Sequence, residues 1–332
     1  MRTGPRTGTG PRTHARARVR AWAELLRLPA LFTVPGDVLA GAAAAGVRPG
    51  YRTLLSIGSS VCLYEAGMVL NDWADRTEDA AERPHRPLPS GRVSPAAALT
   101  AACALTGAGL ALAAGAGRPA LTVAAPLAAT VWAYDLALKH TPAGPVAMAG
   151  ARALDLLLGA ATAGRARPAL PAAALLGTHT LAVTAVSRRE TTGGSALAPL
   201  AALATTAVLT RLVTRPPVRL PAGRLPAGRR EAASRGLPGR TPAPRPGSGR
   251  SAASWPTACL GAAYAATAAR PDFHAALNPS PPLTQRAVGG GIRATIPLQA
   301  ALTARSGASA LGLLIAGLAP LGRRFAGKVS IT

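Results

Sequence analysis

Clustered acidic residues between positions 71 and 79 have the types and spacing of a metal site. The segment reads N-D-W-A-D-R-T-E-D, so Asp72, Asp75 and Asp79 stand at positions i, i+3 and i+7. On a continuous α-helix this spacing places the three carboxylates on one face. Like charges held together are unfavourable unless a cation lies among them. Mg²⁺ prefers oxygen ligands and often bridges carboxylates to the phosphates of a substrate, so the spacing predicts a Mg²⁺ site.

Basic residues follow these acids directly, in the sequence R-P-H-R-P-L-P-S-G-R from position 83 to position 92. The guanidinium groups of Arg83, Arg86 and Arg92 can bind phosphate oxygens in a bidentate manner, and the prolines between them stiffen the loop. The alternative is that these are the ordinary solvated charges of a loop. However, five of the 13 acidic residues fall between positions 72 and 82. The segment therefore predicts a metal and a phosphate bound together.

The elements that carry these residues are predicted to lie in a membrane. Hydrophobic residues make up 49% of the 332 positions and charged residues only 15%, which is a low charged fraction for a soluble protein of this size. Stretches such as 93–117 and 168–187 contain no acidic residue, lysine or arginine and are long enough to cross a bilayer. A soluble, alanine-rich helical protein is the alternative. The many small residues favour helices that pack closely in lipid.

Apolar segments recur along the whole chain after position 20. They predict an all-α, polytopic membrane bundle of about nine transmembrane helices, at about 28–48, 52–70, 94–114, 119–138, 143–163, 169–187, 195–214, 252–269 and 292–320. The chain then divides into a disordered basic N-terminal segment (1–20), helices 1–7 with the Asp-rich site (21–214), a linker or insertion rich in Arg, Pro and Gly (215–250), and helices 8–9 with a C-terminal tail (251–332).

The net charge of +24 comes almost entirely from arginine, at the N-terminus and between positions 211 and 250. No aromatic residues alternate with these arginines and no nucleic-acid-binding module is recognisable, so the predicted partner is the lipid bilayer and not nucleic acid. The excess of positive charge in cytoplasmic loops predicts a multi-pass protein of the cell membrane with its N-terminus and active-site loops in the cytoplasm. The same helix count places 215–250 on the outer side, against that rule.

The acidic motif resembles the first signature of the UbiA superfamily of membrane prenyltransferases, N-D-x-x-D-x-x-x-D followed by a basic, proline-rich stretch. Asn71, Asp72, Asp75 and Asp79 match it position for position. The resemblance continues through Y-D-L-A-L-K (134–139) and A-R-A-L-D-L-L-L-G (151–159). It implies a nine-helix bundle around a cavity open to lipid, with Mg²⁺ and the diphosphate of a polyprenyl donor at the cytoplasmic mouth.

The sequence departs from the family pattern at the second signature, an Asp-rich motif in the loop after helix 6. That loop reads S-R-R-E-T-T-G-G-S (187–195), and Glu190 is its only acid. The resemblance implies Glu190 as the remaining metal ligand there. Arg188 and Arg189 either meet the diphosphate charge directly or anchor the helix end on the cytoplasmic side. This loop and I-P-L-Q-A-A-L-T-A-R (296–305) make the chain similar to a UbiA-like branch found in bacterial Ebo-type gene clusters.

Charged residues inside the predicted helices have two interpretations each. Lys139 follows Asp135 by four residues, and Arg152 precedes Asp155 by three. Both cations can therefore form an ion pair within one helix. Alternatively they face the diphosphate, because charges inside a membrane bundle are costly and tend to mark function. Glu65, two helical turns before the acidic motif, either lines a cavity or is neutralised within the bundle.

The resemblance implies a Mg²⁺-dependent enzyme that moves a prenyl group from a polyprenyl diphosphate to an unidentified, lipophilic acceptor and releases pyrophosphate. The catalytic residues would be Asp72, Asp75, Asp79 and Lys139, and the diphosphate would contact Asn71, Arg83, Arg86, Lys139, Arg152, Arg188 and Arg189. A CDP-alcohol phosphotransferase also uses clustered aspartates, but its D-G-x-x-A-R spacing is absent. A non-catalytic carrier of lipid diphosphates, without the second Asp motif, remains the alternative.

Overall fold

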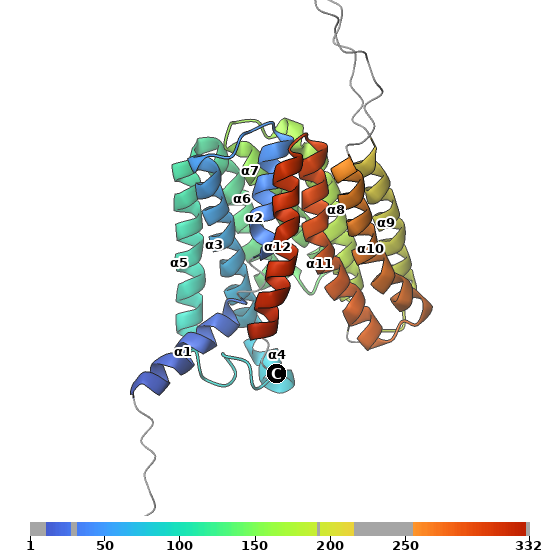
Figure 1. Ribbon diagram of the computed structural model, residues 1–332. Helices are drawn as coiled ribbons and strands as arrows, with labels where there is room; N and C mark the ends of the chain where they lie inside the picture. The colour runs from blue at the N-terminus through green and yellow to red at the C-terminus, as the bar shows by residue number, and fades with distance from the viewer. Residues whose placement is uncertain (1–10, 28–31, 191–192, 216–254, 330–332) are drawn as a thin grey trace, which may run out of the picture.

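Helices account for all the regular secondary structure in the residues that the computed structural model describes, which are 11–27, 32–190, 193–215 and 255–329 (Figure 1). The first half of the chain forms α1 (Pro11–Leu25), α2 (Val34–Ala44), α3 (Tyr51–Ala74), α4 (Arg76–Glu82), α5 (Pro95–Ala116) and α6 (Arg118–Ala133), which the π-helix η2 (Tyr134–Leu138) extends. The second half forms α7 (Gly144–Ala161), η3 (Arg167–Ala169), α8 (Leu170–Ser187), α9 (Leu197–Thr214), α10 (Trp255–Leu277), α11 (Pro281–Arg305) and α12 (Ser309–Val329).

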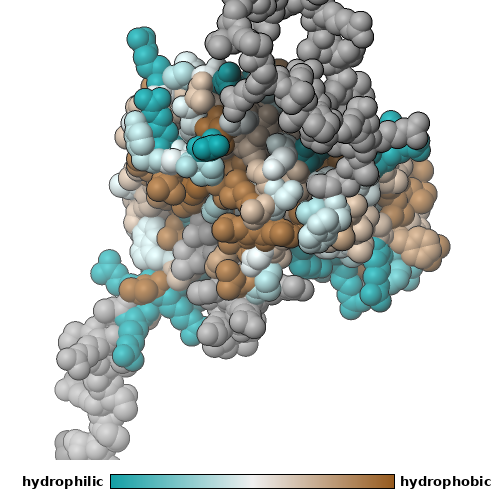
Figure 2. Space-filling view, turned by 45° about the horizontal axis from the view of Figure 1, so that its top comes forward, coloured by the Kyte–Doolittle hydropathy of each residue, from teal (hydrophilic) through white to brown (hydrophobic). Residues whose placement is uncertain are grey.

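The outer surface of the bundle is apolar. Within the described residues, five helical stretches are long and apolar enough to cross a membrane, namely α3, α5, α6 with η2, η3 with α8, and α9. Figure 2 shows hydrophobic residues across the middle of the visible face and hydrophilic residues towards its two ends. Large side chains such as Leu54, Leu200 and Val208 lie exposed, as in a protein that faces lipid. The predicted fold class, an all-α membrane bundle, is confirmed.

The last predicted apolar segment, 292–320, contains parts of two helices. α11 continues to Arg305, the chain turns at Gly307 with a φ of 91°, and α12 begins at Ser309 and packs against α11. Glycine adopts a positive φ without steric strain, so it breaks a stretch that hydropathy alone joins. Of the 12 α-helices in the described residues, all except α1 and α4 belong to the bundle, and the predicted number of nine transmembrane helices is not confirmed.

The two basic segments differ in how far the structure describes them. Composition predicts disorder up to position 20, but α1 begins at Pro11 and buries Ala21 and Leu25 against α3 and α5. The predicted linker 215–250 lies outside the described residues apart from Arg215. α9 ends and α10 begins at the end of the bundle opposite α4 (Figure 1). The residues that flank this linker therefore lie far from the acidic motif.

α2 is a short helix at the centre of the bundle, where it packs against α3, α7 and α11. Every residue from Gly36 to Ala43 is buried. A Cβ atom on Gly41 would overlap the carbonyl oxygen of Leu156 in α7, and one on Gly159 would overlap that of Val38 in α2. Small residues permit this close approach of backbones. The α2 and α7 backbones are therefore in direct contact at the centre of the bundle.

The acidic motif lies at one end of the bundle, where α3 passes into α4 and the proline-rich loop (Figure 1). Leu88 and Val93 in this loop are buried in a cluster with residues of α1, α3 and α5. Ser94 caps the N-terminus of α5, because its hydroxyl accepts a hydrogen bond from the Ala97 amide at 3.2 Å, and Pro95 is the first residue of the helix. These contacts fix the proline-rich loop on α1, α3 and α5 beside the motif.

Two glycines of α7 provide a test of the contact between α2 and α7. We expect Gly159→Ala to destabilise the protein by about 1–3 kcal/mol, as overpacking of a tight interior does, because the new Cβ would lie 2.6 Å from the Val38 carbonyl carbon. Gly150→Ala is the matched control, since nothing lies within 4 Å of its added Cβ. Thermal unfolding in detergent measures both, and equal unfolding temperatures would contradict this packing.

Candidate functional site

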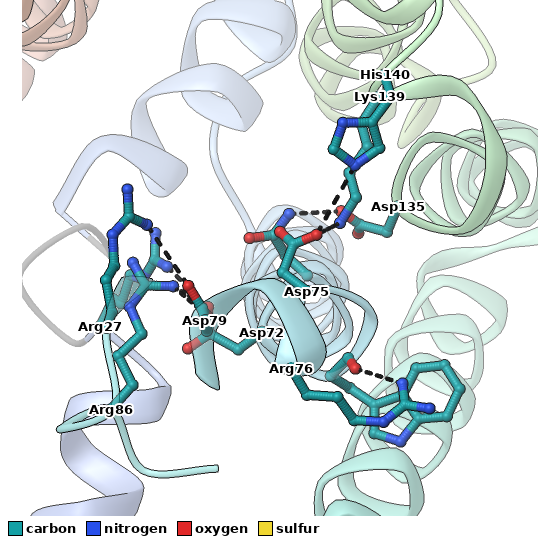
Figure 3. Close-up of polar contacts among 12 residues, drawn as sticks. Arg27, Asp72, Asp75, Arg76, Asp79, Arg86, Asp135, Lys139 and His140 are labelled. Carbon is teal, nitrogen blue, oxygen red and sulfur yellow. Dashed lines mark hydrogen bonds and ion pairs between the residues drawn. The ribbon is translucent and has the colours of Figure 1, made fainter. Parts of the chain in front are cut away.

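Asp72 and Asp79 face a group of arginines on one side of the motif (Figure 3). Both carboxylates are buried, with 5% and 3% of the residue surface exposed. Arg27 Nη2 lies 2.8 Å from Asp72 Oδ1. Arg86 Nη1 lies 2.7 Å from Asp79 Oδ2 and 3.5 Å from Asp72 Oδ1, and Arg83 reaches Asp79 Oδ1 at 3.7 Å. Three guanidinium groups thus neutralise two carboxylates at one place.

Asp75 points away from these two carboxylates, towards η2 (Figure 3). It forms an ion pair with Lys139, and His140 Nε2 lies 3.9 Å from its Oδ1. α3 ends at Ala74 and α4 begins at Arg76, so Asp75 is the residue at the bend between them. The expectation that three carboxylates share one helix face was wrong because it assumed that the helix is continuous through this position.

The π-helix η2 sets the partners of the next two charged residues. The sequence left open an ion pair between Asp135 and Lys139, four residues apart. In the structure, the Lys139 amide bonds to the Tyr134 carbonyl, five residues back, which widens the turn. Lys139 binds Asp75 of the motif, while Asp135 Oδ1 accepts a hydrogen bond from Asn71 Nδ2 at 3.1 Å. Asp135 of η2 and Lys139, which directly follows η2, therefore both contact the α3 end of the motif.

The oxygen donors of the motif suit Mg²⁺. Asp75, Glu78 and His140 bring one ligand atom each to within 4.8 Å of one another, beside a surface cavity of about 350 Å³. Carboxylate oxygens are the ligands that Mg²⁺ takes together with substrate phosphates, and the nearby arginines and Lys139 supply charge for those phosphates. The donor set at this end of the bundle therefore fits a Mg²⁺ diphosphate.

A larger cavity of about 510 Å³ lies inside the bundle, between α3, α6, α7, α8 and α11. Apolar side chains line most of it, among them Leu63, Met68, Leu127, Val131, Met148 and Val183. Arg27, Asn71 and Asp135 line it at the motif end. A cavity of this size holds a ligand of several hundred daltons. The charged motif thus lies at the mouth of an apolar chamber.

The remaining residues expected at the site lie in three places. Arg152 is deeper in the bundle, with its Nε 3.0 Å from Asp37 Oδ2. Arg188 is exposed and donates to the Thr141 carbonyl oxygen, and Arg189 is exposed beside it. Glu190 is partly exposed and belongs to no cluster of metal-ligating side chains among the described residues. The predicted roles of these four residues stay predictions.

Glu65 is buried, with 5% of its surface exposed, and does not line the larger cavity. Its two carboxylate oxygens make no hydrogen bond within the described part of the chain. Arg27, which interacts with Glu65 electrostatically, was not singled out from the sequence because it is one of many arginines before α2. Only its ion pair with Asp72 distinguishes it, and the sequence spacing of 45 residues gives no sign of that contact.

Comparisons with known proteins agree with this architecture. The model of the UbiA prenyltransferase family matches residues 30–214. The chain is 34% identical over 158 residues to digeranylgeranylglyceryl phosphate synthase of Methanopyrus kandleri. These residues make up 46% of this chain and 56% of that relative. The chain thus spans little more than half the length of this relative.

Two solved structures share the fold. One concerns digeranylgeranylglyceryl phosphate synthase in membranes and has a TM-score of 0.59 at 15% identity, over 87% of this chain and 98% of that chain. The other is the apo structure of a UbiA homolog from Aeropyrum pernix K1, with a TM-score of 0.57 at 16% identity, over 82% of this chain and 96% of that chain.

Arg86 and Arg92 provide a matched pair for testing the site. Arg92 binds Glu24 and the His85 carbonyl, at 2.7 and 2.6 Å, and no acid of the motif. We expect Arg86→Ala to weaken Mg²⁺-dependent binding of pyrophosphate about tenfold or more, since a hydrogen bond to a charged group contributes about 1.5–3 kcal/mol. Arg92→Ala should change it less than about threefold. Calorimetry on the detergent-purified protein measures both, and equal losses would argue against this site.

Proposed function

Because the chain belongs to the UbiA prenyltransferase family, we propose that it is a Mg²⁺-dependent enzyme that transfers a prenyl group from a polyprenyl diphosphate to a lipophilic acceptor. One observation carries the proposal. The buried Asp72 and Asp79, the partly exposed Asp75 and their basic partners gather where an apolar cavity of about 510 Å³ meets the end of the bundle. A polyprenyl diphosphate has the same division, with a charged head and an apolar chain.

The reaction would proceed at the mouth of the cavity. The bond between C1 of the prenyl chain and the diphosphate oxygen breaks, a bond between C1 and the acceptor forms, the acceptor loses a proton, and pyrophosphate leaves. Arg27, Arg86 and Lys139 stand where they can hold the departing negative charge, which is the electrostatic stabilisation that such a step needs. Bound Mg²⁺ would supply further positive charge there, held by Asp72 and Asp79 on one side of the motif and by Asp75 on the other.

The ion pairs of the motif already bring together the acids and bases that a metal diphosphate would bind. Asp72, Asp75 and Asp79 each already face a cation of the protein. When a metal diphosphate binds, the carboxylates can turn to the metal while the same cations turn to the phosphate oxygens. Each carboxylate and each cation then keeps a partner of opposite charge. A buried charge without such a partner would be costly inside a membrane protein. Asn71 and Arg83 lie beside these groups and complete the proposed head-group site.

The loop after α8 is proposed to complete the site from the other side. Arg188 and Arg189 would meet diphosphate charge, and Glu190 would offer one further metal ligand. Their position at the end of α8, with Arg188 bonded to the segment that follows Lys139, supports this assignment. The excess of arginine at the N-terminus supports a cytoplasmic location for this end of the bundle, in a multi-pass protein of the cell membrane.

A non-catalytic carrier of lipid diphosphates is the second candidate. It is favoured by one observation, the presence of a single acid, Glu190, where the family's second signature has several aspartates. A carrier would retain the head-group site of Asp72, Asp75 and Asp79 and the apolar cavity. It would bind a prenyl diphosphate with Mg²⁺ but would not break the bond to its diphosphate.

Pyrophosphate release separates the two candidates. Membranes that contain the protein would be supplied with farnesyl or geranylgeranyl diphosphate, Mg²⁺ and a host lipid extract as the source of acceptor. We expect release from the wild type and a loss of about 100-fold or more in Asp72→Asn, a magnitude typical of a removed electrostatic stabiliser. Glu82→Gln is the control, because Glu82 is an exposed acid of α4. Tight Mg²⁺-dependent binding without release, in the presence of a competent acceptor, would favour the carrier.

Glu190→Gln tests the proposed second metal ligand separately. If Glu190 binds the metal, the variant should need about tenfold more Mg²⁺ for half-maximal pyrophosphate release, because one charged ligand is lost. The same substitution should leave the maximal rate at saturating Mg²⁺ closer to the wild type than Asp72→Asn does. An unchanged Mg²⁺ dependence would show that Glu190 is no ligand and that the site uses the first motif alone.

A further inference from the structure

We propose that the inner end of the large cavity is a subsite for a neutral, hydroxyl-bearing group of the acceptor, and that Asp155, Arg152 and Ser60 form it. The inference rests on the proposed prenyl transfer, since it concerns the second substrate of that reaction. All three residues line the cavity, and they lie on α7 and α3, away from the diphosphate motif.

A buried network holds Arg152 in place from behind. Its Nε lies 3.0 Å from Asp37 Oδ2, and Asp37 Oδ1 accepts a hydrogen bond from Gln299 Nε2 at 2.7 Å. The same Gln299 nitrogen donates to the Thr33 carbonyl at 2.8 Å, and the Gln299 side chain packs so closely on Gly36 that a Cβ there would overlap it. Asp37 and Gln299 are both 0% exposed. The guanidinium group of Arg152 on α7 is therefore paired with a buried carboxyl group of α2, which α11 contacts through Gln299.

Asp155 lies one helical turn after Arg152 and on the same face of α7. The residue is 8% exposed, and its Oδ1 has no hydrogen-bond partner within the described part of the chain. Ser60 and Asp37 both stand beside Asp155 and interact with it electrostatically, although the Ser60 hydroxyl makes no hydrogen bond of normal distance and angle with the described residues. A buried polar atom without a partner costs about 1–3 kcal/mol. Asp155 lines the cavity and keeps 8% of its surface exposed, so a polar ligand can reach this residue.

The charges of this cluster select the kind of ligand. Asp37 and Asp155 carry two carboxyl groups and Arg152 one guanidinium group, so the cluster has no excess of positive charge. A phosphate or carboxylate of an acceptor would be repelled here. A hydroxyl group fits, because it can donate to the Asp155 carboxyl group and accept from the guanidinium N–H groups of Arg152.

The depth of the cluster shows that it does not belong to the diphosphate site. Ser60 stands twelve residues before Asp72 on α3, which corresponds to about 18 Å along a helix at 1.5 Å per residue. A purely hydrocarbon chain in this part of the cavity would leave Asp155 facing apolar atoms. We therefore expect an acceptor with polar groups at two places, its nucleophile near the motif and a hydroxyl-bearing end at Asp155.

Binding of two matched lipids tests the subsite. 1-O-decylglycerol carries two hydroxyl groups on an apolar chain, and its dimethyl ether has the same skeleton without them. With protein in detergent, we expect wild type to bind decylglycerol at least about tenfold more tightly than the ether, and Asp155→Leu to lose this preference. Asp155→Asn retains a side-chain oxygen that can accept a hydrogen bond, so it should lose only part of the preference for decylglycerol. Equal binding of both lipids by wild type, or a preference unchanged in Asp155→Leu, would overturn the proposal.

Two controls separate this subsite from the proposed reaction and from misfolding. Asp72→Asn, at the motif, should bind decylglycerol as wild type does while losing Mg²⁺-dependent binding of a non-hydrolysable geranylgeranyl diphosphate analogue. Asp155→Leu should show the converse, which also demonstrates that it is folded. If wild type binds decylglycerol selectively but not the diphosphate analogue, the proposed donor is wrong and the polar subsite stands. If it binds only the analogue, the donor stands and the subsite fails.

Discussion

The pairing of buried charges inside a lipid-facing bundle is the constraint on which the rest of this structure depends. An ion taken from water into such an interior costs several kcal/mol unless a partner of opposite charge meets it. Asp72 pairs with Arg27, Asp75 with Lys139 and Asp79 with Arg86. These pairs join α3 and α4 to the α1 end, the proline-rich loop and η2. The same contacts that stabilise the fold therefore assemble acids and bases at one place.

Close backbone packing brings a second set of charged residues into contact deeper in the bundle. Gly41 and Gly159 bring α2 and α7 into direct contact, so that Asp37 of the short central helix reaches Arg152. Larger residues at this crossing would separate the helices by the width of a side chain. The cavity therefore has charged residues at the motif end, apolar side chains along most of its wall, and a polar cluster of Ser60, Arg152 and Asp155.

Much of this organisation could be predicted from the chain alone. The apolar segments predicted a helical membrane bundle, which the structure confirms. The site for a metal and a phosphate at Asp72, Asp75 and Asp79 stays a prediction. The errors have local physical causes. Asp75 occupies a bend between two helices, and the π-helical turn at Tyr134–Leu138 changes the partner of Lys139. Gly307 breaks a stretch that hydropathy joins. Each depends on a backbone geometry that residue spacing does not encode.

The sequence by itself determined which residues can carry charge in the membrane and where along the helices they stand, because hydropathy and helical periodicity are properties of neighbouring residues. Only the tertiary structure decided which charges meet. Arg27 reaches Asp72 across 45 positions and Gln299 reaches Asp37 across 262. Such pairings follow from the packing of whole helices, in which a buried charge is stable only beside a partner that the fold brings to it from a distant part of the chain.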